Sequence, residues 1–155
     1  MTDPIWSKRC SPLPFLGSKR CHPPGIPFSQ LPTIHLILIS HDHYDHLDKQ
    51  TVLALAKRFP QATRMVPQQV KPWFDLQEIF PVYQCQWWQE RVLTFPNRDS
   101  KRVKITAVPT QHFSGRKHWC LNDTLWVGWV LEFYEKSQLA KKIYFVGDTG
   151  YNSID

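Results

Sequence analysis

Short apolar runs separated by polar loops predict several strands along this chain. Residues 33–39 form a nearly continuous apolar run rich in β-branched side chains, which is typical of a strand buried on both faces. Residues 101–108 alternate between polar and apolar side chains, as expected for a half-buried strand. Residues 125–133 and 143–146 are further apolar strands. His35 falls inside the first of these runs, so we expect it to be a packed core residue.

One helix is predicted directly after the first strand. Asp48 is a suitable N-cap for a helix over about residues 49–59, because its carboxylate can accept hydrogen bonds from the first backbone N–H groups. The apolar stripe of this helix has the spacing i, i+3, i+4 and i+7 and consists of Val52, Leu55, Ala56 and Phe59. Strands and a helix in this order indicate the α/β class.

The loop between that strand and that helix is crowded with metal-binding side chains. Its sequence is His41-Asp42-His43-Tyr44-Asp45-His46. Side chains two apart on extended backbone point the same way, so His41 and His43 can bind one ion together. After a change of backbone direction, Asp45 and His46 can reach a second ion. Imidazole and carboxylate groups suit zinc and similar divalent ions, so the spacing predicts two metals.

The simplest alternative is a histidine-rich surface loop that binds nothing. The context of the motif disfavours it, because a buried strand precedes the histidines and a capped helix follows them. The carboxyl end of a strand is a habitual position for active sites in α/β proteins.

Residues 40–48 resemble the HxHxDH signature of the metallo-β-lactamase superfamily of binuclear metal hydrolases. Other segments resemble the branch that contains the N-acyl-phosphatidylethanolamine-hydrolysing phospholipase D and its bacterial relatives. These segments are residues 3–20, 110–116, 124–129 and 145–151. Essentially the whole chain is covered by the resemblance.

The resemblance implies a ligand set for two zinc ions per complete domain, and other divalent metals also suit it. His41, His43 and His112 would hold one ion, Asp45 and His46 the other, and Asp148 would bridge the two. The predicted strands at 101–108 and 143–146 each end just before one of these ligands, which agrees with the assignment. Asp45 and Asp148 would be catalytic: Asp45 would orient the attacking water and take up a proton, and Asp148 would hold the metal spacing. Tyr44 would contact the substrate.

The fold implied by the resemblance is an αββα sandwich, of which this chain covers mainly the first αβ half. The family pattern extends beyond both ends of the sequence and includes a further metal-binding histidine after Asp148. We therefore expect residues 1–155 to be a partial domain. Within it, residues 1–32 contain seven of the thirteen prolines and should form an irregular segment, and residues 33–155 should form the metal-binding αβ portion.

The reaction implied by the resemblance is hydrolysis of a phosphodiester through a metal-bridging hydroxide. The substrate would be an N-acyl-phosphatidylethanolamine-like lipid, cleaved to phosphatidic acid and an N-acylethanolamine. A lactonase or a nuclease of the same superfamily would use the same metal chemistry. Nucleic acid is disfavoured as a partner, because the chain shows no appended domain of the kind that usually gives a nuclease its specificity. A truncated, non-catalytic metal-binding remnant is the alternative outside the enzymes.

The amino-acid composition limits the kinds of partner and the cellular compartment that we expect for this protein. An apolar fraction of 42% argues against disorder, and a formal charge of +6 favours an anionic partner. No apolar stretch approaches the roughly 18 residues that span a bilayer, so membrane contact would be peripheral. Trp6, Phe15, Leu16 and Phe28 could provide it, or they could pin a long loop to the domain. The four cysteines, at positions 10, 21, 85 and 120, form no CxxC motif, which predicts reduced thiols in the cytoplasm. The oligomeric state stays open.

Overall fold

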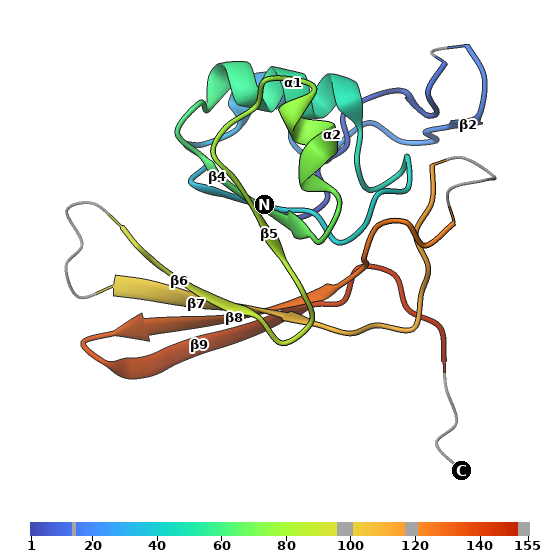
Figure 1. Ribbon diagram of the computed structural model, residues 1–155. Helices are drawn as coiled ribbons and strands as arrows, with labels where there is room; N and C mark the ends of the chain where they lie inside the picture. Colours follow the sequence, from blue (N-terminus) through green and yellow to red (C-terminus); the bar gives the residue numbers. More distant parts are fainter. Residues whose placement is uncertain (14, 96–100, 117–120, 152–155) are drawn as a thin grey trace.

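Two β-sheets pack face to face in the computed structural model of this protein, and helices cover the outer face of one of them (Figure 1). The structure describes residues 1–13, 15–95, 101–116 and 121–151. The layers therefore follow the order helices, parallel sheet, antiparallel sheet. This arrangement confirms the mixed α/β class predicted from the sequence.

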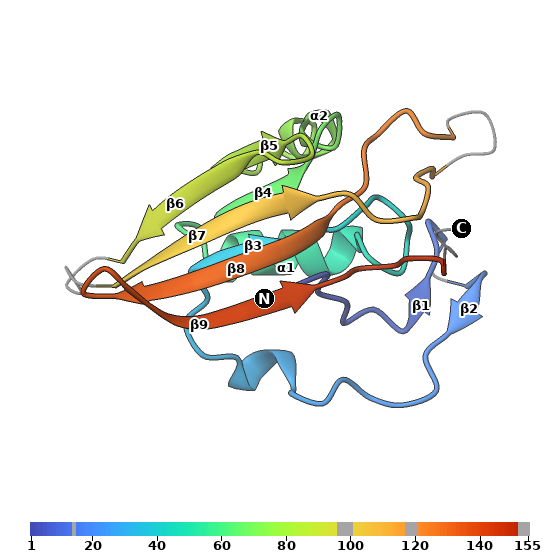
Figure 2. The same ribbon diagram turned by 90° about the horizontal axis from the view of Figure 1, so that it is seen from below.

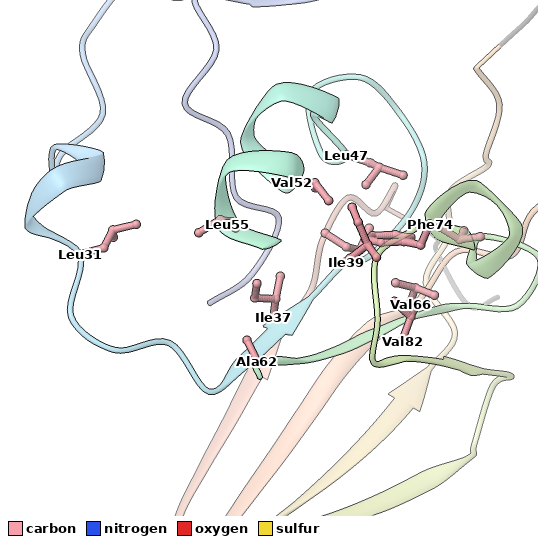
Figure 3. Close-up of a cluster of buried hydrophobic side chains, with 12 residues drawn as sticks. Leu31, Ile37, Ile39, Leu47, Val52, Leu55, Ala62, Val66, Phe74 and Val82 are labelled. Atoms are coloured by element: carbon pink, nitrogen blue, oxygen red, sulfur yellow. The ribbon is translucent and has the colours of Figure 1, made fainter. Parts of the chain in front are cut away.

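The first sheet is parallel and is covered on both faces. It contains β3 (Leu36–Leu38), β4 (Thr63–Pro67) and β5 (Val82–Cys85), in that spatial order. The helix α1 (Lys49–Arg58) connects β3 to β4, and α2 (Lys71–Asp75) connects β4 to β5. Apolar side chains from the helices and the sheet form the first core cluster (Figure 3), including Ile37, Ile39, Val52, Leu55, Val66 and Phe74.

The second sheet is antiparallel and has one buried face. It contains β6 (Glu90–Thr94), β7 (Lys101–Val108), β8 (Gly128–Glu135) and β9 (Gln138–Phe145). Its inner face carries Ile105, Trp129 and Leu131, which join Leu38 and Met65 of the first sheet in a second core cluster. Because side chains alternate along a strand, charged residues occupy the opposite face.

That outer face carries a ladder of ion pairs across all four strands. Lys104 on β7 lies 3.1 Å from Glu90 on β6 and 2.8 Å from Glu132 on β8. Lys142 on β9 lies 3.0 Å from Glu132. Opposite charges on neighbouring strands suit a face in contact with water.

The N-terminal segment wraps around the parallel sheet (Figure 2). It starts beside β3, where Thr2 forms a parallel bridge with Leu38. It then forms a small hairpin of β1 (Arg9–Cys10) and β2 (Ser18–Lys19) and a 3₁₀ turn, η1 (Phe28–Gln30). Trp6 and Phe28 meet edge to face at 5.7 Å and pack against the first core cluster.

The local predictions differ in accuracy. Asp48 caps α1 by accepting a hydrogen bond from the backbone of Thr51, as predicted, and β7 has the predicted bounds. The strand expected over residues 33–39 covers only Leu36–Leu38. His35 consequently lies before the strand and is exposed, so its assignment to the core was wrong. β9 begins at Gln138, five residues before the predicted start at residue 143.

None of the helices in the described part of the chain has the length and apolar character needed to cross a bilayer. Cys10, Cys21 and Cys85 are free thiols. Cys120 lies outside the described residues. The cytoplasmic location that we expect from the cysteines stays a prediction.

Candidate metal centre

The segments that follow two strands, β3 and β7, meet at one point of the structure and bring three imidazoles together. His41 and His43 follow β3, and His112 follows β7. The Nε2 atom of His41 lies 2.8 Å from Nδ1 of His43 and 3.1 Å from Nε2 of His112. His112 Nε2 lies 3.3 Å from His43 Nδ1. The three ring nitrogens therefore form a nearly equilateral triangle, although two of these side chains are about 70 residues from the third along the chain.

The triangle fits a zinc ion. Ligand nitrogens about 2.0–2.1 Å from a tetrahedral zinc lie roughly 3.3 Å from one another. The observed separations are close to that value. Three imidazoles that leave a fourth position for water or a substrate are the donor set of a catalytic rather than a structural zinc site.

A second donor set lies directly beside the first. The Nε2 atom of His46 is 3.3 Å from Oδ2 of Asp148 and 3.7 Å from Oδ2 of Asp45. The same Oδ2 atom of Asp148 is 3.8 Å from Nε2 of His112. One oxygen of Asp148 thus faces a histidine of each set, which is the position that a bridging carboxylate requires. The structure brings together all six residues that the sequence indicated as ligands.

Asp3 lies within this site, a position that the sequence did not reveal. Its Oδ1 atom accepts a hydrogen bond from the backbone N–H of Ser40 at 2.7 Å, and its Oδ2 atom accepts from the Ser40 hydroxyl at 2.5 Å. Oδ2 also lies 2.7 Å from Nδ1 of His46. Nothing local in residues 1–32 marks Asp3, because its partners lie about 40 residues away along the chain.

This network determines which ring nitrogen of His41 and of His46 can bind a metal. The Ser40 hydroxyl donates to Asp3, so it accepts from Nδ1 of His41, 2.9 Å away, and leaves Nε2 of His41 free to bind a metal. In the same way, Nδ1 of His46 donates to Asp3, and Nε2 of His46 faces Asp45 and Asp148. Such outer hydrogen bonds orient ligands and raise their basicity.

Burial and neighbouring charges separate the histidine pKa values. Burial, with the other histidines of the cluster, lowers the pKa of His41 to about 2. Burial and His43 also lower the pKa of His112. Burial alone would lower the pKa of His46, but its hydrogen bond to Asp3 and the charges of Asp3, Asp148 and Asp45 raise it above its ordinary value. The His41 imidazole is therefore neutral and able to bind a metal at physiological pH, whereas a proton competes with a metal more strongly at His46 than at His41.

The loop after His112 is fastened to the histidine loop. Asp42 is buried, and its Oδ1 atom accepts a hydrogen bond from the backbone of Gly115 at 2.8 Å. Arg116 donates from Nε to the carbonyl of Asp42 at 2.6 Å and from Nη2 to the carbonyl of Leu47. The guanidinium of Arg116 also lies 4.5 Å from the centre of the Tyr44 ring. Tyr44 therefore faces Arg116 and the side of the loop away from the imidazole triangle.

The loop that carries Asp148 is fastened at two places. Gly147 has φ of 69°, and a Cβ atom there would lie 2.7 Å from Cβ of Ser40, so only glycine lets this loop approach the histidine loop so closely. The backbone of Gln111 donates to Oγ1 of Thr149 at 3.1 Å and accepts from the N–H of Gly150 at 2.7 Å. The His112 and Asp148 loops are thus hydrogen-bonded to each other.

An open hollow of about 760 Å³ leads to these two loops. Its lining includes His112, Phe113 and Asp148. The Asp148 side chain is 45% exposed and the Asp45 side chain 59%, whereas His41 is only 1% exposed. A substrate can therefore approach from the side of the carboxylates.

Comparison with known proteins identifies a family and several relatives of this chain. The model of the beta-lactamase superfamily domain matches residues 1–155. An uncharacterized protein of Mycobacterium tuberculosis is 38% identical over 156 residues, which cover 97% of this chain and 37% of the relative. N-acyl-phosphatidylethanolamine-hydrolyzing phospholipase D 1 of Caenorhabditis elegans is 32% identical over 160 residues, which cover 100% of this chain and 43% of that protein. The chain thus spans less than half of the length of these relatives.

A solved structure confirms the fold. The isothiocyanate hydrolase from Delia radicum gut bacteria superposes with a TM-score of 0.58 at 20% sequence identity. The match covers 97% of this chain and 56% of that enzyme. At this identity the likeness concerns the fold alone, and it agrees with the sandwich predicted from the sequence.

Proposed function

Because this chain belongs to the metallo-β-lactamase superfamily of hydrolases, we propose that it carries the metal centre of a phosphodiesterase of the phospholipase D type. The observation that carries the proposal is the convergence of His41, His43 and His112 beside His46 and Asp148, with nitrogen separations suited to zinc. The proposed substrate is an N-acyl-phosphatidylethanolamine-like phospholipid, supported by the similarity to the phospholipase of Caenorhabditis elegans.

Two divalent ions would be held by the six ligands. His41, His43 and His112 would hold the first ion, Asp45 and His46 the second, and Asp148 would be shared between the two. The chemistry that such a pair supplies when bound is a water of near-neutral pKa and positive charge beside the phosphoryl oxygens. Zinc is the proposed metal because imidazole and carboxylate donors dominate the set.

The side chains around the ligands have separate tasks in this proposal. Asp3 and Ser40 hold His46 and His41 with the correct nitrogen toward the metals. The exposed carboxylate of Asp45 orients the attacking water and accepts its proton. Asp148 keeps the two metal positions at a constant separation. Attack then occurs at phosphorus, and no nucleophilic side chain is required.

The surroundings of the site suit a lipid phosphodiester. The hollow that reaches His112 and Asp148 is open and is bordered by the half-exposed ring of Phe113, which lies 4.8 Å from the His43 ring. Tyr44 is proposed as a substrate contact on the other side of the loop. An open approach with an aromatic border accepts a large amphiphilic substrate more readily than an enclosed pocket does.

The test is hydrolysis of N-acyl-phosphatidylethanolamine in detergent micelles, after metal removal and again with added zinc, by the 155-residue chain and by a form extended at both ends. We expect two zinc ions per chain by elemental analysis and phosphatidic acid as a zinc-dependent product for the extended form, and weaker zinc binding with little or no hydrolysis for the 155-residue chain. Asp45→Asn should retain zinc at the three histidines and lose most of the hydrolysis. His35→Ala, which changes an exposed histidine outside the cluster, is the matched control and should behave as the wild type.

Other outcomes identify the alternatives. Zinc-dependent opening of a lactone, or cleavage of RNA, with no action on the lipid would replace the proposed substrate by that of another superfamily branch. Two bound zinc ions with no hydrolysis of any of these substrates would identify the chain as a non-catalytic metal-binding module. Failure to bind zinc at all would contradict the metal centre itself.

A further inference from the structure

A second cavity lies beside the histidine loop, between the N-terminal segment and the start of α1. Its volume is about 520 Å³. Residues 6–9, 11 and 12 form one wall, residues 48–50 form another, and Tyr44 and Arg116 close the end toward the histidine loop. The proposed substrate contact Tyr44 lies in its lining but the ligands of the metal centre do not, so the proposed reaction gives the basic part of this cavity no task.

The lining of this cavity is strongly basic. It includes Lys8, Arg9, Lys49 and Arg116, and its single carboxylate is Asp48. In the described part of the chain none of these four cations forms an ion pair. The carboxylate of Asp48 accepts hydrogen bonds from Ser7 and Thr51. With four cations against one carboxylate, the lining has an excess of positive charge that suits a phosphate.

The hairpin that forms one wall ends in exposed apolar side chains. Leu13 is 43% exposed, Phe15 69% and Leu16 54%, and all three lie in the turn between β1 and β2. Arg9 and Lys19 are paired across the two strands of the same hairpin. The hairpin therefore has apolar side chains at its tip and cations behind the tip. A bilayer surface has the matching order, because its apolar acyl region lies below its anionic headgroups.

The other two aromatic residues considered for membrane contact are occupied within the protein. Trp6 and Phe28 pack on each other and on the first core cluster, and the indole of Trp6 donates a hydrogen bond to the carbonyl of Ile26. Phe15 and Leu16 have no such cover. The hairpin lies at the same end of the molecule as the segment that carries Asp148, as both ribbon views show (Figures 1 and 2).

We propose that this hairpin docks the protein on an anionic bilayer, with Leu13, Phe15 and Leu16 inserted among the acyl chains and the basic cavity binding the phosphate of an anionic lipid headgroup. This docking rests on the proposed function, because its purpose would be to keep the metal centre beside the membrane that contains the lipid substrate. Docking itself needs neither metal nor hydrolysis, so it can be tested separately.

The test is sedimentation of the chain, with a metal chelator present, with vesicles of phosphatidylcholine alone or of phosphatidylcholine mixed with phosphatidylglycerol. We expect binding to the mixed vesicles and little binding to the neutral ones. Phe15→Ser with Leu16→Ser should weaken binding at least about tenfold, because two inserted side chains are lost. Lys8→Gln with Lys49→Gln should weaken it about 25-fold, at roughly fivefold for each cation.

The controls remove the same chemistry from other surfaces. Lys57→Gln with Lys141→Gln removes two exposed lysines from α1 and β9, and Leu76→Ser removes an exposed leucine after α2. Both should bind as the wild type does. Equal losses in the lysine control and in the cavity variant would show diffuse attraction by net charge and overturn the proposal. Equal binding of wild type and the Phe15→Ser, Leu16→Ser variant would exclude insertion of the hairpin.

Failure of docking can be told apart from failure of the proposed function. These vesicles contain no N-acylated lipid and the chelator prevents turnover, so binding does not depend on hydrolysis. A chain that hydrolyses the lipid in micelles but does not sediment with anionic vesicles keeps the proposed function and loses the docking surface. The reverse result keeps the docking surface and removes the phosphodiesterase.

Discussion

The parallel and the antiparallel sheet contribute to one metal centre in different ways. The parallel sheet is covered on both faces, and the first residues after β3 are buried: Ser40 and His41 are each 1% exposed. The antiparallel sheet has a charged outer face, and the segment after β9 presents Asp148 with 45% exposure. The comparison shows a buried half of the centre on the parallel sheet, which provides His41 and His43, and an accessible half on the antiparallel sheet, which presents Asp148 to solvent.

The two halves are joined close to the ligands. Trp129 on β8 is fully buried and donates a hydrogen bond from its indole to the carbonyl of Ile39 at 3.0 Å. The backbone of Val127 donates to the carbonyl of Ser40 at 2.8 Å. Gly147 packs against the Ser40 side chain. The relative position of the two sheets therefore determines the distance between His41 and Asp148.

Removal of the two imidazoles of the buried half, His41 and His43, should have the largest effect on zinc binding. We expect His41→Ala with His43→Ala to weaken zinc binding at the three-histidine position by a thousandfold or more, on the order of half the binding energy of a four-ligand site. Isothermal titration calorimetry with zinc measures this. Asp148→Ala, in the accessible half, should retain the first ion and lose the second. If the two variants lost the same number of ions, the division into two halves would be wrong.

Trp129, which joins the two sheets, should be the position at which a substitution lowers the stability of the fold most. Trp129→Ala should lower the free energy of unfolding by about 3–5 kcal/mol, because it leaves a cavity between the sheets and an unpaired carbonyl at Ile39. Trp129→Phe keeps most of the volume and removes only the N–H group, so it should cost about 1–3 kcal/mol. Urea unfolding followed by circular dichroism measures both. A similar small loss for both variants would mean that the sheets are held together elsewhere.

The elements that the sequence predicted well are those with complete local signals. The helix α1 has its cap, Asp48, and its apolar stripe within a dozen residues, and β7 alternates polar and apolar side chains over its whole length. β9 was predicted too short, because Lys141 and Lys142 interrupt its apolar pattern on an exposed strand. The hairpin before it also turns without glycine, through Lys136 and Ser137, which both have positive φ. Nothing in the local pattern marks that turn.

The residues of the candidate site also divide into those with a local sequence signal and those without one. The cluster from His41 to His46 was evident from spacing, because all of its ligands lie within six residues. Asp3 could not be found in this way, since its contacts with Ser40 and His46 depend on the N-terminal segment lying beside β3. His35 was misassigned because an apolar run predicts a buried strand without showing where the strand begins. Long-range pairing and strand ends are therefore what the pattern left undetermined.

A substitution of Asp3 should have an effect of intermediate size on the buried half, because Asp3 orients ligands but is not one of the three imidazoles. Asp3→Asn should weaken zinc binding and zinc-dependent hydrolysis about 10- to 100-fold, because an amide accepts fewer hydrogen bonds and no longer favours Nε2 of His46 for the metal. The visible spectrum of the cobalt-substituted protein should change as the ligand geometry loosens. Asp3→Glu, which keeps the carboxylate, should recover part of the affinity. An unchanged cobalt spectrum in Asp3→Asn would reduce the residue to a purely structural role.

The charged outer face of the antiparallel sheet should give the smallest effect. Hydrogen bonds from Lys104 and then Lys142 lower the pKa of Glu132 below its ordinary value. A carboxylate with a lowered pKa stabilises the folded state above its unfolded pKa, and this stabilisation is lost as the pH falls through the folded pKa. Glu132→Gln should therefore lower the melting temperature by less than about 3 °C at pH 7, and the difference from wild type should shrink as the pH falls through the folded pKa of Glu132.

Glu78→Gln is the matched control for that variant, since Glu78 is exposed and forms no ion pair among the residues that the structure describes. It should leave the melting temperature at pH 7 nearly unchanged. Zinc binding should be unaffected in both variants, because the ladder faces away from the buried side of the sheet. A larger loss of stability in Glu132→Gln than in Trp129→Phe would mean that the outer face, and not the joint at Ile39, holds the antiparallel sheet in the position that the metal centre requires.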